Sequence, residues 1–298
     1  MRPAALALVL LAAPAARAQT PEIVAAVEAK LGTIRYVLKL EVPAGGFAPA
    51  LDGKPGLRAT SAGARALKYS GAKVPNVDKH AAFVMSCFDP KTGGFADAPG
   101  GKADVTLTSV GIMAATELGV PKERYRKALD YLKEHARTFE EVRIAAGGVE
   151  AWGVKDCPFN LNPWIDVAYA ELKGKLPEPR DGGARTTGSA VALVARLGAR
   201  ISRQEHLILT GDLTSGQRPD GGWGKAGAKS SDLESTYRVM RALVLLEQPP
   251  LDRARLRAFL ASCRNADGGS AVQPGEASGA GPTYYSAIVT HWLAGFEK

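Results

Sequence analysis

Residues 87–119 read CFDPKTGGFADAPGGKADVTLTSVGIMAATELG, and this stretch decides the fold. It contains the end of a predicted helix, a Gly-Gly-Phe turn, a polar loop and a second, apolar helix. In the second helix Val110, Met113 and Ala114 recur at helical spacing, which indicates one apolar face. Thr108 opens this helix, fifteen residues after the first glycine of the pair. The stretch therefore predicts a unit of helix, glycine turn, loop and helix.

The same unit recurs along the chain. Glycine pairs that follow a helical stretch begin at Gly45, Gly93, Gly147, Gly182, Gly221 and Gly268. Four of these units also place a threonine fifteen residues after the first glycine, at Thr60, Thr108, Thr236 and Thr283. The third and fourth units lose this register. Self-similarity at a spacing of tens of residues is typical of repeat architectures, so we expect six units.

Each unit predicts two helices. The helix before the glycine pair is predicted at residues 79–87 in one unit and at residues 252–263 in another. The glycines allow a positive φ where the chain leaves this helix. The aromatic residue after the pair is expected to cover the turn, as Phe47, Phe95 and Trp223 would do.

No segment shows the β-branched alternation of strands, which favours an all-α fold. Six helical hairpins bury their apolar faces best when they close on themselves. The sequence therefore predicts an (α/α)6 toroid, with a ring of inner helices inside a ring of outer helices.

The first residues are typical of an export signal. MRPAALALVLLAAPAARAQT combines a positive charge at Arg2, an apolar run over residues 4–13 and the small-residue site Ala16-Arg17-Ala18. The run is too short to span a bilayer. The pattern predicts a signal peptide at residues 1–18, a toroid domain at residues 19–298, and a secreted or periplasmic protein.

Composition excludes several classes of function. The chain has 298 residues, 46% of them apolar, which is enough for a large core. Its net charge is +8, but the basic residues are spread over helix faces and are not interleaved with aromatic residues, which argues against nucleic-acid binding. No membrane span is predicted. Cys87, Cys157 and Cys263 cannot all pair with one another, so at least one thiol should be free.

The repeat resembles the prenyltransferase and squalene-oxidase repeat family, which includes protein prenyltransferase β subunits and triterpene cyclases. The resemblance covers nearly the whole chain after the signal peptide. It is most specific in residues 87–118 and in residues 217–246, QRPDGGWGKAGAKSSDLESTYRVMRALVLL. The QxxxGGW pattern in the second segment is similar to the glutamine–tryptophan motif of the cyclases. This resemblance implies the same (α/α)6 toroid.

A toroid of this kind predicts a funnel with a polar mouth. If all inner helices start at one rim, their free amides favour an anionic head group there. An apolar wall for an isoprenoid-like or lipid-like tail is expected from Tyr237, Tyr284, Tyr285, Trp292, Met113 and Met240. The alternative is that these side chains only fill the barrel.

The catalytic zinc of protein prenyltransferases is only partly represented. The resemblance implies an aspartate and a cysteine two residues apart, with a histidine from the next repeat. Asp232 stands at the position of the aspartate, but Glu234 replaces the cysteine, and residues 282–285 contain no histidine. His291 is the one histidine on a predicted inner helix, and we expect it to be a core or pore-lining residue.

The diphosphate contacts are also incomplete. Asp104 keeps the family register, yet Leu107 replaces the expected histidine. Lys229 matches a basic residue that would contact diphosphate, while Ala226 replaces its arginine companion. The chain also lacks the Asp-x-Asp-Asp and Asp-Asp-x-x-Asp segments that cyclases use.

The sequence therefore predicts an exported toroid that binds an apolar, isoprenoid-like or lipid-like ligand, or a protein partner, in its funnel. Its catalytic metal site is expected to be incomplete: the resemblance leaves zinc as the candidate cofactor, with Asp232 as one ligand, but the usual cysteine and histidine ligands are missing. The alternatives are an active prenyltransferase-type enzyme and a polysaccharide-active (α/α)6 enzyme with a pair of carboxylates at the rim. Candidate catalytic residues are Asp232, Glu234 and Asp104, for which helix N-terminal charge is the structural alternative. Candidate ligand-binding residues are Lys229, Tyr237, Tyr284, Tyr285 and Trp292.

Overall fold

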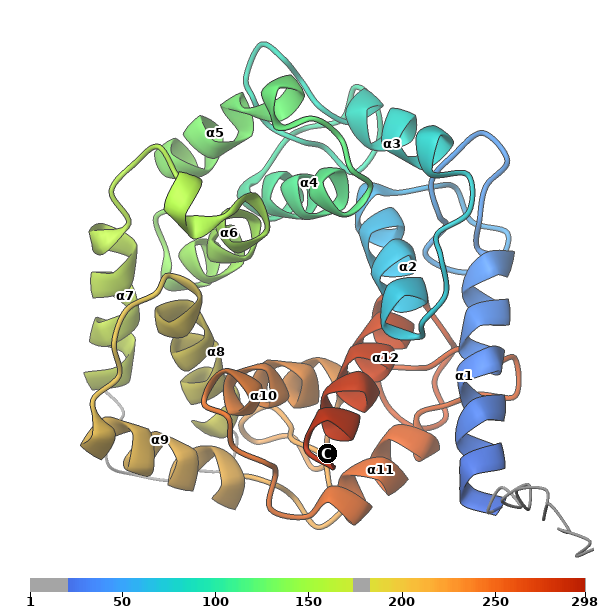
Figure 1. Cartoon of the computed structure of the whole chain (residues 1–298), viewed down its shortest axis with the longest axis vertical. Helices are drawn as coiled ribbons and strands as arrows, with labels where there is room; N and C mark the ends of the chain where they lie inside the picture. Colours follow the sequence, from blue (N-terminus) through green and yellow to red (C-terminus); the bar gives the residue numbers. More distant parts are fainter. Residues whose placement is uncertain (1–20, 174–182, 298) are drawn as a thin grey trace, which may run out of the picture.

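The computed structural model describes residues 21–173 and 183–297. The predicted signal peptide at residues 1–18 lies outside the described residues, as does Gly182. The α-helices of the described ranges alternate between an inner and an outer ring (Figure 1). The inner ring contains α2 (Leu57–Tyr69), α4 (Val105–Glu117), α6 (Phe139–Trp152), α8 (Gly183–Arg196), α10 (Leu233–Leu245) and α12 (Ala280–Gly295). The outer ring contains α1 (Pro21–Lys39), α3 (Val77–Ser86), α5 (Lys127–His135), α7 (Asn162–Lys173), α9 (Arg203–Ser215) and α11 (Arg253–Ser262).

The inner ring is closed. Each inner helix packs on the next one, and α12 returns to pack on α2. Short 3-10 helices follow α4 at Lys122–Tyr125 and α6 at Val154–Asp156. The described residues form isolated β-bridges around the turns and no strand. The predicted (α/α)6 toroid is confirmed.

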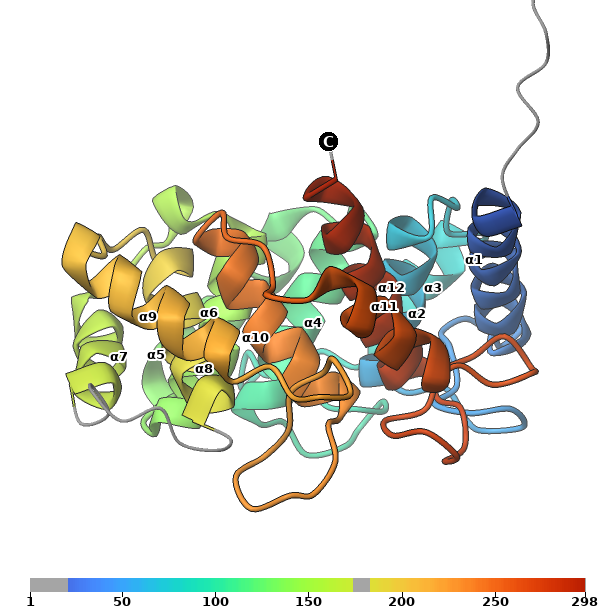
Figure 2. The same ribbon diagram turned by 90° about the horizontal axis from the view of Figure 1, so that it is seen from below.

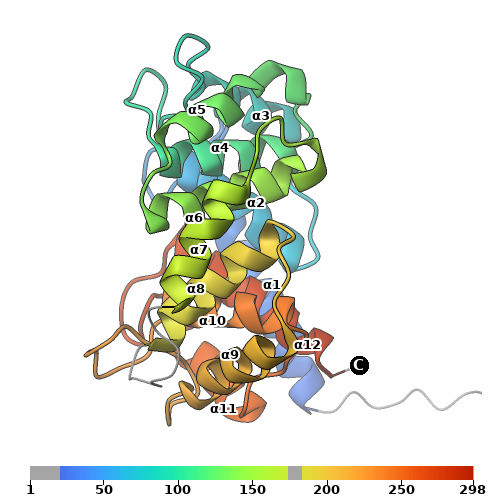
Figure 3. The ribbon, with the colours of Figure 1, turned by 90° about the vertical axis from the view of Figure 1, so that its left-hand side faces the viewer.

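All six inner helices start on the same face of the toroid. Figure 2 shows the long loops that lead into α4, α10 and α12 along one face, with the C-terminus on the opposite face. Seen from the side in Figure 3, outer helices overlie inner ones, and the C-terminus lies at one edge of the toroid. The described apolar core lies mostly between the two rings, where inner and outer helices face each other.

One hydrogen bond explains the fifteen-residue register of the repeat. The threonine of the inner helix accepts a hydrogen bond from the backbone N–H of the residue after the glycine pair. The four bonds are Phe47 to Thr60 at 3.0 Å, Phe95 to Thr108 at 3.0 Å, Trp223 to Thr236 at 3.1 Å and Ser270 to Thr283 at 2.9 Å. All four are buried, so each ties a turn to the helix that follows it.

The aromatic residue of the turn packs as expected. Phe47, Phe95 and Trp223 are fully buried. A Cβ on Gly111 of α4 would lie 2.3 Å from the Phe95 ring, so the small residue makes room for the large one. Gly221 has a φ of +93°, and a Cβ there would lie 2.2 Å from the backbone carbonyl of Arg255, which explains the need for glycine.

The third glycine pair is not a turn, and the expectation of six equivalent glycine turns is wrong in this unit. Gly147 and Gly148 are buried in the middle of the inner helix α6. A Cβ on Gly148 would lie 3.0 Å from Ser109 Oγ, so this glycine allows α4 and α6 to pack closely. The turn into α6 is instead a short segment with a capping box between Thr138 and Glu141. In the fourth unit, Gly183 is the first residue of α8.

None of the described helices is both long and apolar enough to cross a lipid bilayer. Cys87, Cys157 and Cys263 are all free thiols, which confirms that at least one is unpaired.

Candidate functional site

Aromatic side chains gather inside the inner ring. This aromatic cluster comprises Tyr69, Tyr237, Tyr284, Tyr285 and Trp292. The Tyr237 ring is stacked between Tyr285 and Trp292, with centroid distances of 4.9 and 5.6 Å. Tyr284 lies 5.8 Å from Tyr237 and 6.3 Å from Tyr69. The cluster therefore joins three inner helices, α2, α10 and α12, by their side chains.

Tyr237 lies close to the axis of the toroid. Its phenol is influenced electrostatically by Arg65 on α2 and by Arg196 on α8. Helices α2 and α8 stand on opposite sides of the inner ring (Figure 1). A side chain that lies within reach of both must point into the space that the ring encloses, which we call the lumen.

The lumen is rich in arginine. The side chains that meet there from inner helices are Arg65, Arg143, Arg185, Arg196, Arg238 and Arg241, with the glutamates Glu140, Glu150 and Glu234. Two of the glutamates sit on α6 and reach arginines of α10, across the intervening helix α8. Among the described residues that make these ion pairs and ring contacts, the six arginines outnumber the three glutamates.

The first halves of the inner helices contribute one ion-pair network, the N-terminal network. Arg238 contacts Glu140 at 2.9 Å and Glu234 at 2.6 Å. Arg143 contacts Glu140 at 2.7 Å, and Arg185 contacts Glu234 at 3.1 Å. Burial alone would raise the pKa of Glu140, but Arg143 and Arg238 outweigh it and lower the pKa to about 2.

The second halves contribute the central cluster, formed by Arg65, Arg196, Arg241 and Glu150. Glu150 contacts Arg196 at 3.1 Å and also pairs with Arg241. Arg65 has no carboxylate partner among the described residues. It donates to Met113 Sδ at 3.6 Å, and its guanidinium lies 4.5 Å above the Tyr284 ring. One carboxylate thus faces three guanidinium groups.

This charge acts on Tyr237. Burial alone would raise the pKa of its phenol, but the positive charges of Arg196, Arg65 and Arg241 outweigh it and lower the pKa to about 7. On α12, burial raises the pKa of Tyr285 to about 12. Two stacked tyrosines therefore differ strongly in acidity, because only one of them faces the arginines of the central cluster.

Solvent reaches both parts of the lumen. The side chain of Glu234 is 32% exposed and that of Glu150 is 34% exposed, although both meet arginines inside the ring. Tyr237, Tyr285 and Met113 are half-buried. Parts of the aromatic cluster and the carboxylates of both charged groups are therefore in contact with solvent.

The expectation of a wholly apolar funnel wall is wrong. Tyr237, Tyr284, Tyr285 and Trp292 do come together, but arginines lie among them, and Arg241 stands 5.8 Å over the Trp292 ring. Met240 is fully buried in the core cluster. The sequence predicts that the basic residues lie on solvated helix faces, whereas Arg65 and Arg241 lie on inner helices and contact aromatic rings of the cluster.

The candidate catalytic carboxylates all have structural partners. Asp232 is the N-cap of α10 and accepts hydrogen bonds from Ser235 N at 2.7 Å and from its Oγ at 2.8 Å. Asp104 caps α4 by accepting from Leu107 N at 2.7 Å. Glu234 pairs with the arginines of the N-terminal network. These contacts give the three carboxylates structural roles: Asp104 and Asp232 cap helices, and Glu234 is an ion-pair partner.

The residues at the start of α10 do not fit the zinc ion that the resemblance suggests. Asp232 already uses both carboxylate oxygens, and Glu234 is paired with arginine. Within residues 21–173 and 183–297, no three His, Cys, Asp or Glu side chains are grouped as metal ligands. His291 is exposed and lies 5.3 Å from the Tyr69 ring, and Lys229 is exposed in the loop before α10. We therefore derive no chemistry through a metal.

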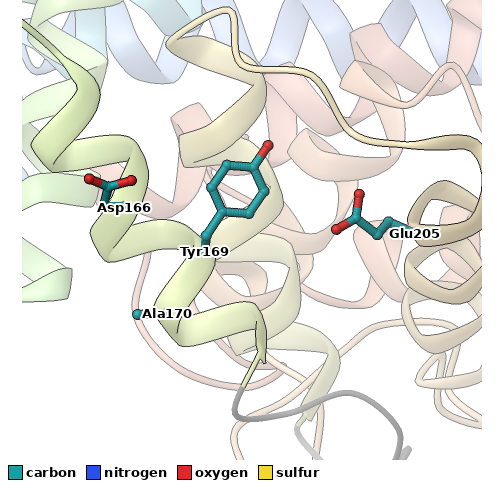
Figure 4. Close-up of a pocket in the computed structure, with 4 residues that line it drawn as sticks. All are labelled: Asp166, Tyr169, Ala170 and Glu205. Carbon is teal, nitrogen blue, oxygen red and sulfur yellow. The ribbon is translucent and has the colours of Figure 1, made fainter.

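A separate pocket lies outside the ring, between α7 and α9. It is open to solvent, has a volume of about 480 Å³ and is lined by Asp166, Tyr169, Ala170 and Glu205 (Figure 4). Glu205 belongs to the capping box of α9, and Tyr169 donates to the carbonyl of Arg200 at 2.5 Å. The carboxylate of Glu205 and the hydroxyl of Tyr169 thus already make hydrogen bonds within the protein. The pocket also lies apart from the arginines of the lumen.

Known proteins share this architecture. The type II terpene cyclase MstE from Scytonema superposes with a TM-score of 0.60 at 11% identity, over 91% of this chain and 97% of that chain. A protein from Actinoplanes superposes with a TM-score of 0.60 at 12% identity, over 91% and 99% of the two chains. A comparison with curated proteins finds no match. At these identities the structural matches show the fold alone.

The sequence itself matches a family. The profile of the prenyltransferase alpha-alpha toroid domain matches residues 70–130 and 120–297, which together are well over half of the chain. The chain belongs to the prenyltransferase alpha-alpha toroid family.

Proposed function

We propose that this protein binds an amphiphilic small molecule, with an isoprenoid-like or lipid-like apolar part, in the lumen of the toroid. One observation carries this proposal: the aromatic cluster contacts arginines, and these arginines outnumber the carboxylates that pair with them. Aromatic faces accept an apolar chain, and surplus guanidinium groups accept an anionic group. One site therefore offers both kinds of contact that an amphiphile needs.

Related folds support this choice of ligand class. MstE from Scytonema, in two variants, was solved with geranylgeranyl dihydroxybenzoate as substrate and with merosterolic acid A as product. Both compounds join an apolar part to a polar group. The same toroid can therefore enclose such a molecule, and the aromatic cluster of this chain supplies a wall of suitable chemistry.

The proposed role is binding and not catalysis. Prenyl transfer of the zinc type needs a metal-activated thiolate, and the residues at the start of α10 do not offer the ligands. Glycoside hydrolysis needs two free carboxyl groups, whereas Asp104 and Asp232 cap helices and Glu234 is ion-paired. We further propose that the chain is exported, with cleavage after Ala18.

The test is direct ligand binding to the purified protein. Native mass spectrometry should detect one geranylgeranyl diphosphate or geranylgeraniol per chain, without zinc. Tryptophan fluorescence should change on binding, and Trp292→Phe should remove most of that change because Trp292 lies in the aromatic cluster. Trp164→Phe, on the outer helix α7, is the matched control and should keep it. Absence of any adduct, or an unchanged response in Trp292→Phe, would refute the proposal.

A further inference from the structure

The outer helix α1 has two faces of different kinds. One face carries the buried residues Thr33, Tyr36, Val37 and Leu40, and with it α1 packs on α2 and α12. The helix lies at the outer edge of the toroid, beyond α2 and α12 (Figures 1 and 2). Its other face is therefore turned away from the ring.

This outward face of α1 is apolar although it is exposed. Of the eleven large apolar side chains that are exposed within the described part of the chain, five lie on α1. Four of these, Val24, Val27, Leu31 and Leu38, are each between 40% and 47% exposed. Together with the half-buried Ile34 they form a stripe, which we call the α1 seam.

The spacing of the α1 seam is that of a helix-pairing surface. Its residues follow one another at alternating steps of three and four, at positions 24, 27, 31, 34 and 38. This is the apolar a and d pattern of a coiled coil, whose side chains pack between those of a second helix. At 1.5 Å per residue the seam extends about 21 Å along the helix, or two heptads. Single exposed apolar residues are ordinary, but a continuous apolar stripe is typical of an interaction surface.

Charged residues beside the α1 seam indicate which helix fits it. Glu28 and Arg35 lie on one flank, seven residues apart, and Lys30 lies on the other flank. All three are exposed, and neither Glu28 nor Arg35 makes an ion pair within residues 21–173 and 183–297. If two copies of α1 pair in opposite directions, Glu28 of each copy lies beside Arg35 of the other. Pairing in the same direction would instead bring Lys30 beside Arg35 of the other copy, which is repulsive.

We propose that the chain forms a two-fold symmetric dimer in which the α1 seams of two copies pack antiparallel. The seam fits a second copy of itself, because its apolar residues meet apolar residues and Glu28 and Arg35 form two opposite-charge pairs across the axis. An isologous interface needs this kind of self-complementarity. The inference does not depend on the proposed function, because α1 contributes no side chain to the aromatic cluster or the central cluster.

The first experiment is sedimentation velocity of the purified chain over a range of protein concentrations. A contact between two single helices is smaller than a standard interface of about 1,600 Å², so the dimer should form at high concentration and dissociate on dilution. Leu31→Glu should raise the dissociation constant by about tenfold or more, because it places an unpaired charge at the centre of the seam. Leu207→Glu, on the exposed surface of α9, is the matched control and should associate like the wild type.

Both leucines are exposed in the single chain, so both variants should keep the circular dichroism spectrum of the wild type. A chain that is monomeric at every concentration would overturn the proposal. Equal association of Leu31→Glu and Leu207→Glu would overturn it as well. A monomer that sediments with phosphatidylglycerol vesicles would also overturn it, and would assign the α1 seam to a membrane surface.

Charge exchange tests the antiparallel orientation. Glu28→Arg alone and Arg35→Glu alone should each weaken the dimer by about threefold or more, because each sets like charges against one another across the axis. The double variant should recover the affinity of the wild type, since the two pairs are restored with exchanged signs. A parallel pairing predicts that Arg35→Glu strengthens the dimer through Lys30. That result, or a double variant as weak as the single ones, would contradict the proposed arrangement.

Discussion

At the scale of single residues, the repeat is held by one threonine hydroxyl per unit. Thr60, Thr108, Thr236 and Thr283 each receive the N–H of the residue that follows a glycine pair. The glycine turn leaves this N–H inside the protein, where no water can replace the bond. An unpaired buried donor is costly, so the same residue type appears at the same spacing in four units.

Thr108→Val should therefore destabilise the fold although it keeps the shape of the side chain. The Phe95 N–H would lose its acceptor, and we expect a loss of about 1–3 kcal/mol in the free energy of unfolding. Urea denaturation measures this loss, and the slope of the unfolding free energy against urea concentration should not change. Thr290→Val is the matched control, because Thr290 is exposed and only bonds the carbonyl of Ser286. Equal effects of the two substitutions would contradict the role assigned to the buried threonine.

At the scale of helices, the inner ring is linked by charges that cross the lumen. Arg238 on α10 reaches Glu140 on α6, and Arg241 reaches Glu150 in the same way. Both ion pairs join helices that are separated by α8 in the inner ring. The buried residues of α8 include the small residues Gly188 and Ala190. The two networks therefore hold α6 and α10 at a fixed separation across the lumen.

This linkage predicts a pH dependence of stability. Arg143 and Arg238 lower the pKa of Glu140 to about 2 in the folded protein, from 4.5 for the free side chain. A lowered pKa means that the stabilisation is present above pH 4.5 and is lost as the pH falls toward 2. Urea midpoints measured from pH 6 down to pH 2 should therefore fall more steeply for the wild type than for Glu140→Gln. Glu28→Gln, on the exposed surface of α1, should follow the wild type, and identical curves for all three proteins would exclude this contribution.

At the scale of helices, the sequence predicts correctly those features that depend only on residues close together in the chain. The helices before and after the glycine turns follow from periodicity and glycine position, as with α3, α4 and α11. The third unit was assigned wrongly, because Gly147 and Gly148 look like a turn in sequence but serve close helix packing in α6. A glycine pair alone does not distinguish these two uses.

At the scale of the whole molecule, the site depends on ring closure. Arg65 and Arg196 are far apart in sequence and on opposite sides of the ring, yet both act on Tyr237. Periodicity places each of them on a helix but cannot say which face points inward or which charge it meets there. The sequence could therefore predict the toroid and the aromatic residues of the funnel, but not the arginines among them.

The central claim is that the lumen of the closed ring holds an amphiphilic ligand, and photoaffinity labelling tests it most directly. A geranylgeranyl diphosphate analogue with a photoreactive group in its apolar chain would be cross-linked to the protein, and the labelled peptides would be mapped. The account predicts labels on α10 and α12, within residues 233–245 and 280–295, that excess unmodified ligand prevents. Labels confined to the outer helices, such as the pocket around Tyr169, would contradict it.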